Sequence, residues 1–133
     1  MITRCVELKR DVITEDEFDT GLRMKLNLGH TIGHGVEAIS NFTLSHGKSV
    51  SIGMAIAAQA SNCRDKDKIF SLLQQFGLPV TTAYSPEEIL PYVLSDKKRT
   101  GGTINLIIPR SIGNCEIVPT PVENLLSFIK AGL

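Results

Sequence analysis

Four polar residues early in the chain recur at the spacing of one helical stripe. They are Arg23, Asn27, His30 and His34. Their spacing of i, i+4, i+7 and i+11 would place all four side chains on the same side of a single helix. Neutral imidazole is the commonest metal ligand in proteins, and His46 follows shortly after this stripe. The pattern predicts a site for zinc or a similar divalent metal, with hydrogen-bonded histidines of no chemical role as the alternative.

Spacing alone favours His30 and His34 as the pair of ligands, as in zinc helices of the His-Glu-x-x-His type. The residue after His30 is Thr31, however, and the nearby carboxylate on this segment is Glu37. A protease-like mechanism would therefore lack its general base. We reject that mechanism and keep the metal site.

The neighbouring stripe of the same segment contains two glycines, Gly29 and Gly33, beside Leu22 and Leu26. Each glycine costs about 1 kcal/mol of helix propensity relative to alanine. Such a cost indicates that another helix or a ligand approaches this face closely.

The elements that would hold these residues are mainly helical. Apolar periodicity and capping residues predict helices at about 23–39, 47–62, 66–76, 86–95 and 122–130, after a loosely helical segment at 2–13. Runs of β-branched residues predict a small two-stranded β element between Thr103 and Val118. We therefore expect one mainly α domain spanning residues 1–133, a usual size for a single domain.

The charge balance limits the classes of partner. Fourteen Lys and Arg residues balance 14 Asp and Glu residues, so the chain has no general field that would bind nucleic acid or an anionic membrane. The uncharged run from Ser49 to Cys63 is shorter than the roughly 20 residues that a bilayer requires, which favours a buried helix. The 3 cysteines form no Cys-x-x-Cys pair, as expected for a reducing cytoplasm.

The histidine segment resembles a known family. Leu26-Asn27-Leu28-Gly29-His30-Thr31-Ile32-Gly33-His34, followed by Ser45-His46-Gly47, is similar to the C-terminal domain of the 3-dehydroquinate synthases, within the sugar-phosphate cyclases. Further matching segments, in the same order along the chain, are Glu7-Leu8-Lys9, Thr20-Gly21-Leu22-Arg23, Ile52-Gly53-Met54, Gly77-Leu78-Pro79 and Asp96-Lys97-Lys98. The resemblance covers nearly the whole chain and implies a multihelical metal- and substrate-binding domain.

The resemblance divides the histidines between two roles. It implies that His30 and His46 bind the metal, Zn²⁺ or another divalent ion such as Co²⁺, together with a Glu from an N-terminal NAD-binding domain. His34 would instead hold the substrate phosphate together with Asn27, as a catalytic residue.

The resemblance also implies residues for the rest of the substrate. Arg23 and the pair Lys97 and Lys98 would anchor the substrate carboxylate, and Arg suits bidentate binding of such a group. Lys9 would contact the substrate in the pocket, also as a catalytic residue. The implied reaction is that of a phosphorus-oxygen lyase, which uses NAD to convert 3-deoxy-arabino-heptulosonate 7-phosphate to 3-dehydroquinate and phosphate in the shikimate pathway of aromatic amino acid biosynthesis.

Three features depart from the family pattern. Asp19 stands where Glu is usual, and Lys48-Ser49 stands where Glu-Ala is common; we expect Lys48 to point to solvent. No Gly-rich dinucleotide-binding unit is present in the sequence, so this chain alone should be inactive and should need an NAD-binding domain as its partner. We further expect the face with Gly29 and Gly33 to be exposed, with possible homo-oligomers as a result.

Two other interpretations remain open. The chain could be the corresponding domain of a related cyclase that acts on another sugar phosphate. It could also be a catalytically silent helical module that binds a partner subunit.

Overall fold

The computed structural model describes residues 1–16, 21–95 and 102–133. Its helices are α1 (Ile2–Glu15), the 3-10 helix η1 (Leu22–Asn27), α2 (His30–Ile39), α3 (His46–Ala60), α4 (Lys66–Gln75), α5 (Pro86–Ser95) and α6 (Val122–Gly132). Two strands, β1 (Thr103–Ser111) and β2 (Asn114–Pro121), complete the described elements. The predicted mainly α fold with one small β element is confirmed.

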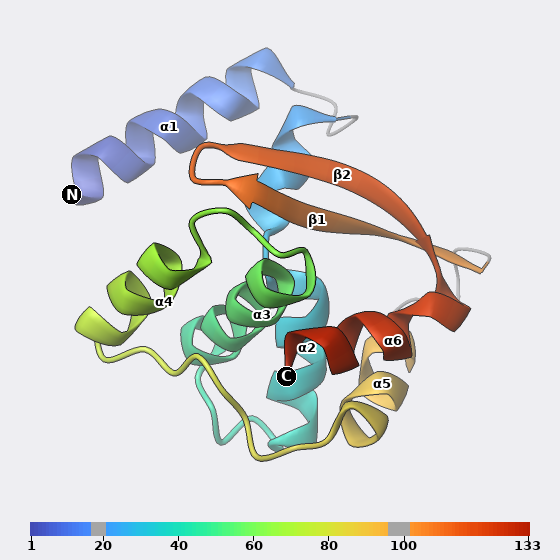
Figure 1. Cartoon of the computed structure of the whole chain (residues 1–133). Helices are drawn as coiled ribbons and strands as arrows, with labels where there is room; N and C mark the ends of the chain where they lie inside the picture. The colour runs from blue at the N-terminus through green and yellow to red at the C-terminus, as the bar shows by residue number, and fades with distance from the viewer. Residues whose placement is uncertain (17–20, 96–101) are drawn as a thin grey trace.

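The core lies where α2, α3, α5 and α6 pack together beneath the β hairpin, which crosses the bundle (Figure 1). Val36, Ile56, Ile89 and Leu125 come from these four helices, one from each, and all are fully buried. The uncharged run predicted as a buried helix forms α3, which contributes eight buried residues. Burial of these apolar side chains is the main stabilising term for such a domain.

Local signals fix the ends of α4 and α5 as predicted. At α5, the Ser85 hydroxyl accepts the Glu88 backbone N–H, and the Glu88 carboxylate accepts the Ser85 backbone N–H at 2.7 Å. This reciprocal pair is a capping box, with Pro86 at the first helical position. Gly77, just past α4, has φ +67°, a left-handed conformation that glycine adopts without steric cost.

The hairpin is longer than predicted, with strands that reach Ser111 and Pro121. The strands pair antiparallel, and a shift in their pairing lies between Pro109 and Ser111. Ile104 and Leu106 are buried while Thr103 and Asn105 are exposed, as the alternation of a strand requires. One face of the hairpin therefore covers the core, and the other is available to the site described below.

The predicted continuous helix from 23 to 39 is wrong. Leu28 has extended backbone angles of φ −52° and ψ 126°, and Gly29 has φ +80°, so the chain breaks between η1 and α2. Asn27 and His30 therefore belong to different elements. The polar stripe is assembled by a turn and not by helical periodicity alone.

The expectation that the Gly29 and Gly33 face is exposed is also wrong, because α3 covers it. A Cβ on Gly33 would lie 2.9 Å from Cα of Val50, and one on Gly29 would lie 2.6 Å from Cγ of Met54. The sequence predicted that either a helix or a ligand approaches this glycine face closely, and in the structure it is a helix.

Helix α1 lies at the side of the molecule, near the hairpin turn (Figure 1). It has no buried residue, and Met1, Ile2 and Val6 are each more than half exposed. None of the helices in the described ranges combines the length and apolar composition that a membrane crossing requires.

Candidate functional site

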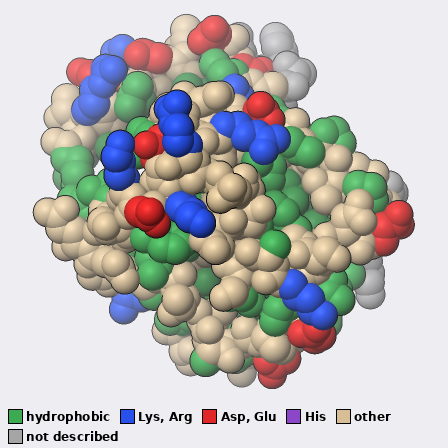
Figure 2. Space-filling model, in the orientation of Figure 1, with side chains coloured by type: hydrophobic (Ala, Val, Ile, Leu, Met, Phe, Trp, Pro, Cys, Tyr) green, Lys and Arg blue, Asp and Glu red, His purple; other side chains and the backbone are tan. Residues whose placement is uncertain are grey.

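The three histidines lie together at the junction of α2 and α3. The ring centroids are 5.6 Å apart for His30 and His34, 5.3 Å for His30 and His46, and 5.5 Å for His34 and His46. His30 begins α2, His34 lies one turn later, and His46 begins α3. The helix–loop–helix connection therefore returns His46 to the other two rings. None of the three shows on the face seen in Figure 2, where acidic and basic side chains are interspersed.

Two of these rings are held through their Nδ1 atoms. His30 Nδ1 lies 3.3 Å from the Leu28 carbonyl oxygen, and His46 Nδ1 lies 3.2 Å from Oε2 of Glu37. Both partners accept hydrogen bonds, so in a neutral ring these contacts favour the tautomer with the proton on Nδ1 and the lone pair on Nε2. An imidazole in this state is a metal ligand without further proton loss.

Glu37 is a site residue that the sequence did not assign. Ligand atoms of His34, Glu37 and His46 all lie within 4.8 Å of one another. Glu37 lies three residues after His34 on α2, the helix that carries His30 and His34. Glu37 could not be assigned from its position on α2 alone, because its partner, His46, lies across a loop.

A cleft of about 300 Å³ opens beside His30 and His34, while His46 is not among its lining residues. Polar side chains from several elements line it: Asn27, His30, Thr31, His34, Tyr92, Thr103 and Asn105. Met24, Val93 and Ile107 add an apolar part to the lining. This mixture suits a small polar ligand held by several donors.

Tyr92, Thr103 and Asn105 were missed in the sequence. The signal for two of them was present in β1, where Thr103, Asn105 and Ile107 alternate with buried Ile104 and Leu106. Alternate residues of a strand share a face, and these three all line the cleft. Without the position of the hairpin, that face could not be connected to the histidines.

The predicted residues Arg23 and Lys9 are not among the described residues that line this cleft. Arg23 lies in η1, where its backbone N–H donates to Oδ2 of Asp16 at 3.0 Å. The same carboxylate oxygen accepts the Gly21 backbone N–H at 2.8 Å. Asp16 thus fixes the entry to the segment that carries Arg23 and Asn27. Lys9 is exposed on α1.

The other predicted residues have two outcomes. Lys48 is exposed, so the expectation that it points to solvent is confirmed. Lys97, Lys98 and Asp19 lie outside the described residues.

Comparison with known proteins gives the family of this chain. Residues 1–99 match the family model described as 3-dehydroquinate synthase C-terminal. The chain belongs to this family. That membership confirms the resemblance seen in the histidine segment.

The curated relatives include two bacterial 3-dehydroquinate synthases. The protein of Enterococcus faecalis is 39% identical over 137 residues, which cover 97% of this chain and 38% of that relative. The protein of Pelobacter propionicus is 40% identical over 136 residues, which cover 96% of this chain and 38% of that relative. The chain therefore spans less than half the length of the family members it matches.

Solved structures share the fold. A 2-deoxy-scyllo-inosose synthase complexed with carbaglucose-6-phosphate, NAD⁺ and Co²⁺ superimposes with a TM-score of 0.81 at 24% identity, covering 99% of this chain and 40% of that one. A 2-epi-5-epi-valiolone synthase from Streptomyces hygroscopicus subsp. jinggangensis 5008, with NAD⁺ and Zn²⁺ bound, gives 0.76 at 21% identity, covering 96% and 39%. At these identities the likeness concerns the fold alone.

Proposed function

We propose that this chain is the metal- and substrate-binding domain of a 3-dehydroquinate synthase, which works together with an NAD-binding domain. The observation that carries this proposal is the meeting of His30, His34 and His46 beside a polar cleft. The shared family and the relatives' names support it. The reaction would convert 3-deoxy-arabino-heptulosonate 7-phosphate to 3-dehydroquinate and phosphate.

The donor set fits a divalent metal such as Zn²⁺ or Co²⁺. His30 and His46 would be the protein ligands from this chain, because both keep Nε2 available while Nδ1 is hydrogen-bonded. A bound divalent metal supplies Lewis acidity that polarises a substrate hydroxyl. A Glu from the NAD-binding domain would complete the protein ligands.

His34 and Asn27 would bind the substrate phosphate, since both line the same cleft. The amide of Asn27 donates hydrogen bonds, and an imidazole can donate one and also accept or release a proton near neutral pH. His34 is therefore the group of this pair that could move a proton as phosphate leaves. Thr31, between the two histidines on the cleft wall, adds a hydroxyl.

The substrate carboxylate would be bound by Arg23 with Lys97 or Lys98, and Lys9 would contact the substrate from α1. Two anionic groups at opposite ends of one substrate need two separate donor clusters. Asp16 supports this role of Arg23, because it ties the backbone of η1 to the end of α1.

NAD would be held by a second domain. The two described strands form one antiparallel hairpin, whereas dinucleotide sites are built on parallel βαβ units with a Gly-rich turn. The described residues thus do not fit NAD, and we assign them no step of hydride transfer.

The test combines this chain with the separately produced NAD-binding domain of a family member. With NAD and Zn²⁺ present, the mixture should release phosphate from the heptulosonate phosphate, and His34→Ala should lower the rate by 100-fold or more, about the contribution of general acid–base catalysis. His30→Ala and His46→Ala should abolish zinc binding in calorimetric titration. Absence of phosphate release from two folded, zinc-loaded domains would count against the proposal.

Two controls separate the other interpretations. A related cyclase whose substrate has no carboxylate would keep its affinity in Arg23→Ala, while the proposed enzyme should lose about tenfold or more, the effect of removing a charged hydrogen bond. A catalytically silent module would give the same zinc heats in wild type, His30→Ala and His46→Ala.

A further inference from the structure

The contact between Glu37 and His46 joins the two helices of the site. Glu37 lies near the end of α2, and His46 is the first residue of α3. Their side chains meet at 3.2 Å, Oε2 to Nδ1, across a loop. The Glu37 side chain is 18% exposed and that of His46 is 52% exposed, so the carboxylate is the more enclosed partner.

The backbone around Glu37 holds this geometry. The Glu37 carbonyl accepts a hydrogen bond from the Ser40 hydroxyl at 2.7 Å and from the Phe42 backbone N–H at 3.1 Å. Asn41 and Phe42 both have left-handed backbone angles, with φ 55° and 59°, although neither is glycine. Non-glycine residues keep left-handed backbone angles only where surrounding contacts hold them there, and such residues are common near functional sites. The tight reversal brings the chain back within five residues to His46.

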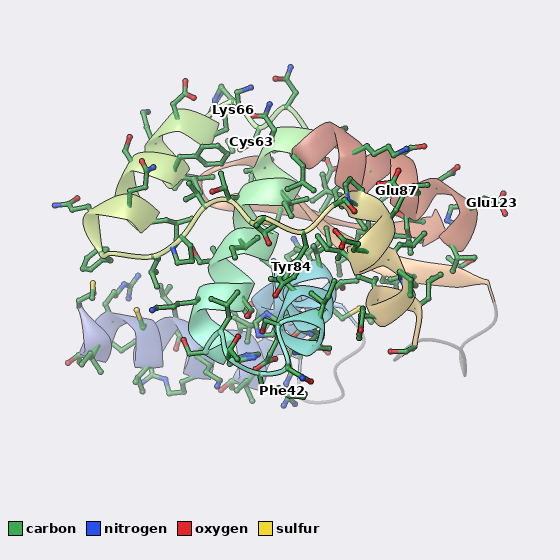
Figure 3. The ribbon with its side chains drawn as sticks, turned by 90° about the horizontal axis from the view of Figure 1, so that it is seen from below. Phe42, Cys63, Lys66, Tyr84, Glu87 and Glu123 are labelled. Carbon is green, nitrogen blue, oxygen red and sulfur yellow. The ribbon has the colours of Figure 1, made fainter. Side chains whose placement is uncertain are left out.

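Phe42 lies at the outer edge of the molecule in Figure 3 and is 73% exposed. Its burial therefore does not explain the strained turn. The contact that the turn does produce is the one between the Glu37 carboxylate and the His46 ring.

We propose that Glu37 is a positioning residue of the metal site, which holds the His46 ring in its Nδ1–H tautomer and so leaves Nε2 free to bind the metal. Metal-ligating histidines commonly donate their second ring N–H to a carboxylate or a backbone carbonyl. Both partner types occur here, Glu37 for His46 and the Leu28 carbonyl for His30. The metal role of His46 rests on the proposed function; the tautomer does not.

A direct role of Glu37 as a ligand is the alternative, since its carboxylate also lies within 4.8 Å of donor atoms of His34 and His46. The substitution Glu37→Gln distinguishes the positioning role from the ligand role. An amide oxygen can accept the Nδ1–H hydrogen bond, so Glu37→Gln keeps the positioning contact. The same amide is a much weaker ligand than a carboxylate for a transition metal.

The first measurement needs no metal. Long-range ¹H–¹⁵N correlation spectra at about pH 8.5, some two units above the ordinary histidine pKa, report the tautomer of each neutral ring. We expect Nδ1–H for His46 in wild type and in Glu37→Gln, and a shift toward Nε2–H in Glu37→Ala. His30 serves as the internal reference, because its Nδ1 partner is the Leu28 backbone carbonyl. An unchanged His46 spectrum in Glu37→Ala would overturn the proposal.

The second measurement is zinc titration by calorimetry on the same variants and on His46→Ala, each mixed with the NAD-binding domain of a family member, which the proposed function requires for the third protein ligand. Glu37→Ala should weaken binding by about 10–100-fold, the usual cost of losing such a partner, whereas Glu37→Gln should stay within about threefold of wild type. Glu123→Ala removes an exposed carboxylate from the first turn of α6 and should bind as wild type does.

The outcomes separate the two proposals. Wild-type affinity in Glu37→Ala, or a loss in Glu37→Gln as severe as in His46→Ala, would overturn the positioning role. If wild type bound no zinc while the tautomer of His46 still followed residue 37, the proposed function would fail and the assignment of Glu37 to the His46 ring would stand.

Discussion

Two buried serines on α3 differ in whether their hydroxyl groups have a hydrogen-bond partner. Ser49 and Ser51 are 0% and 2% exposed. The Ser51 hydroxyl donates to the Pro79 carbonyl at 2.8 Å, while the Ser49 hydroxyl has no hydrogen-bond partner among the described residues. A buried hydroxyl without a partner costs free energy that folding does not recover.

We predict that Ser49→Ala raises the free energy of unfolding by about 1 kcal/mol, because it removes an uncompensated polar group and places the better helix former in α3. Ser51→Ala is the matched control and should lower it by about 1 kcal/mol, since the Pro79 carbonyl loses its donor. Urea unfolding of both variants measures the difference. Equal shifts in the same direction would contradict the hydrogen-bond argument.

The geometry of the site depends on how closely helix α2 approaches helix α3. Gly53 makes this approach possible: a Cβ there would overlap the Gly29 carbonyl oxygen and lie 2.8 Å from the Gly33 backbone nitrogen. Backbone atoms cannot move aside as a side chain can. Three glycines therefore set the separation of the helices that carry His30 and His46.

We predict that Gly53→Ala lowers the free energy of unfolding by about 3 kcal/mol, the upper range for overpacking a core. Gly47→Ala, six residues earlier on α3, has no atom within 4 Å of the added Cβ and should instead be stabilising by about 0.5–1 kcal/mol. Thermal unfolding of both variants compares them directly. A mild effect of Gly53→Ala would mean that the two helices can separate without loss of packing.

Helices α4 and α5 could be predicted closely because their end signals are local: Ser85 and Glu88 cap one start, and Gly77 follows one end. The start of α2 could not, because helical periodicity continues through Leu28 and Gly29 while their backbone angles do not. The grouping of the histidines was predictable from their types and spacing. Glu37 and Asn105 were not, since their roles depend on contacts across a loop and on the placement of the hairpin.

Three carboxylates connect secondary-structure elements or cap a helix. Glu87 on α5 pairs with Lys130 on α6 at 2.7 Å, and Figure 3 places Glu87 at the boundary of these helices. Asp65, before α4, accepts the Ile112 backbone N–H from the hairpin turn at 3.1 Å. Glu88 completes the cap of α5.

These contacts lower the pKa of each group in the folded protein. The hydrogen bond from Lys130 lowers the pKa of Glu87. The pKa of Glu88 is lowered mainly by the hydrogen bond from the Ser85 backbone N–H and, to a smaller extent, by that from the Ser85 hydroxyl. The hydrogen bond from the Ile112 backbone N–H is the largest cause of the lowered pKa of Asp65, and the hydrogen bond from Lys68 is the next largest. Each carboxylate therefore binds a proton more weakly in the folded than in the unfolded chain.

We predict that stability is lost on acidification as the pH falls below the ordinary values, 4.5 for Glu and 3.8 for Asp, because the unfolded chain then binds more protons than the folded one. Above those values all three groups are ionised in both states, and their contribution is fully present. Urea midpoints measured between about pH 7 and pH 3 give the slope. Lys130→Met removes the main cause of the shift at Glu87, so its midpoints should fall less steeply than those of wild type over the same range. A slope unchanged in this variant would show that the pairing of α5 with α6 through Glu87 does not contribute to the acid sensitivity of the fold.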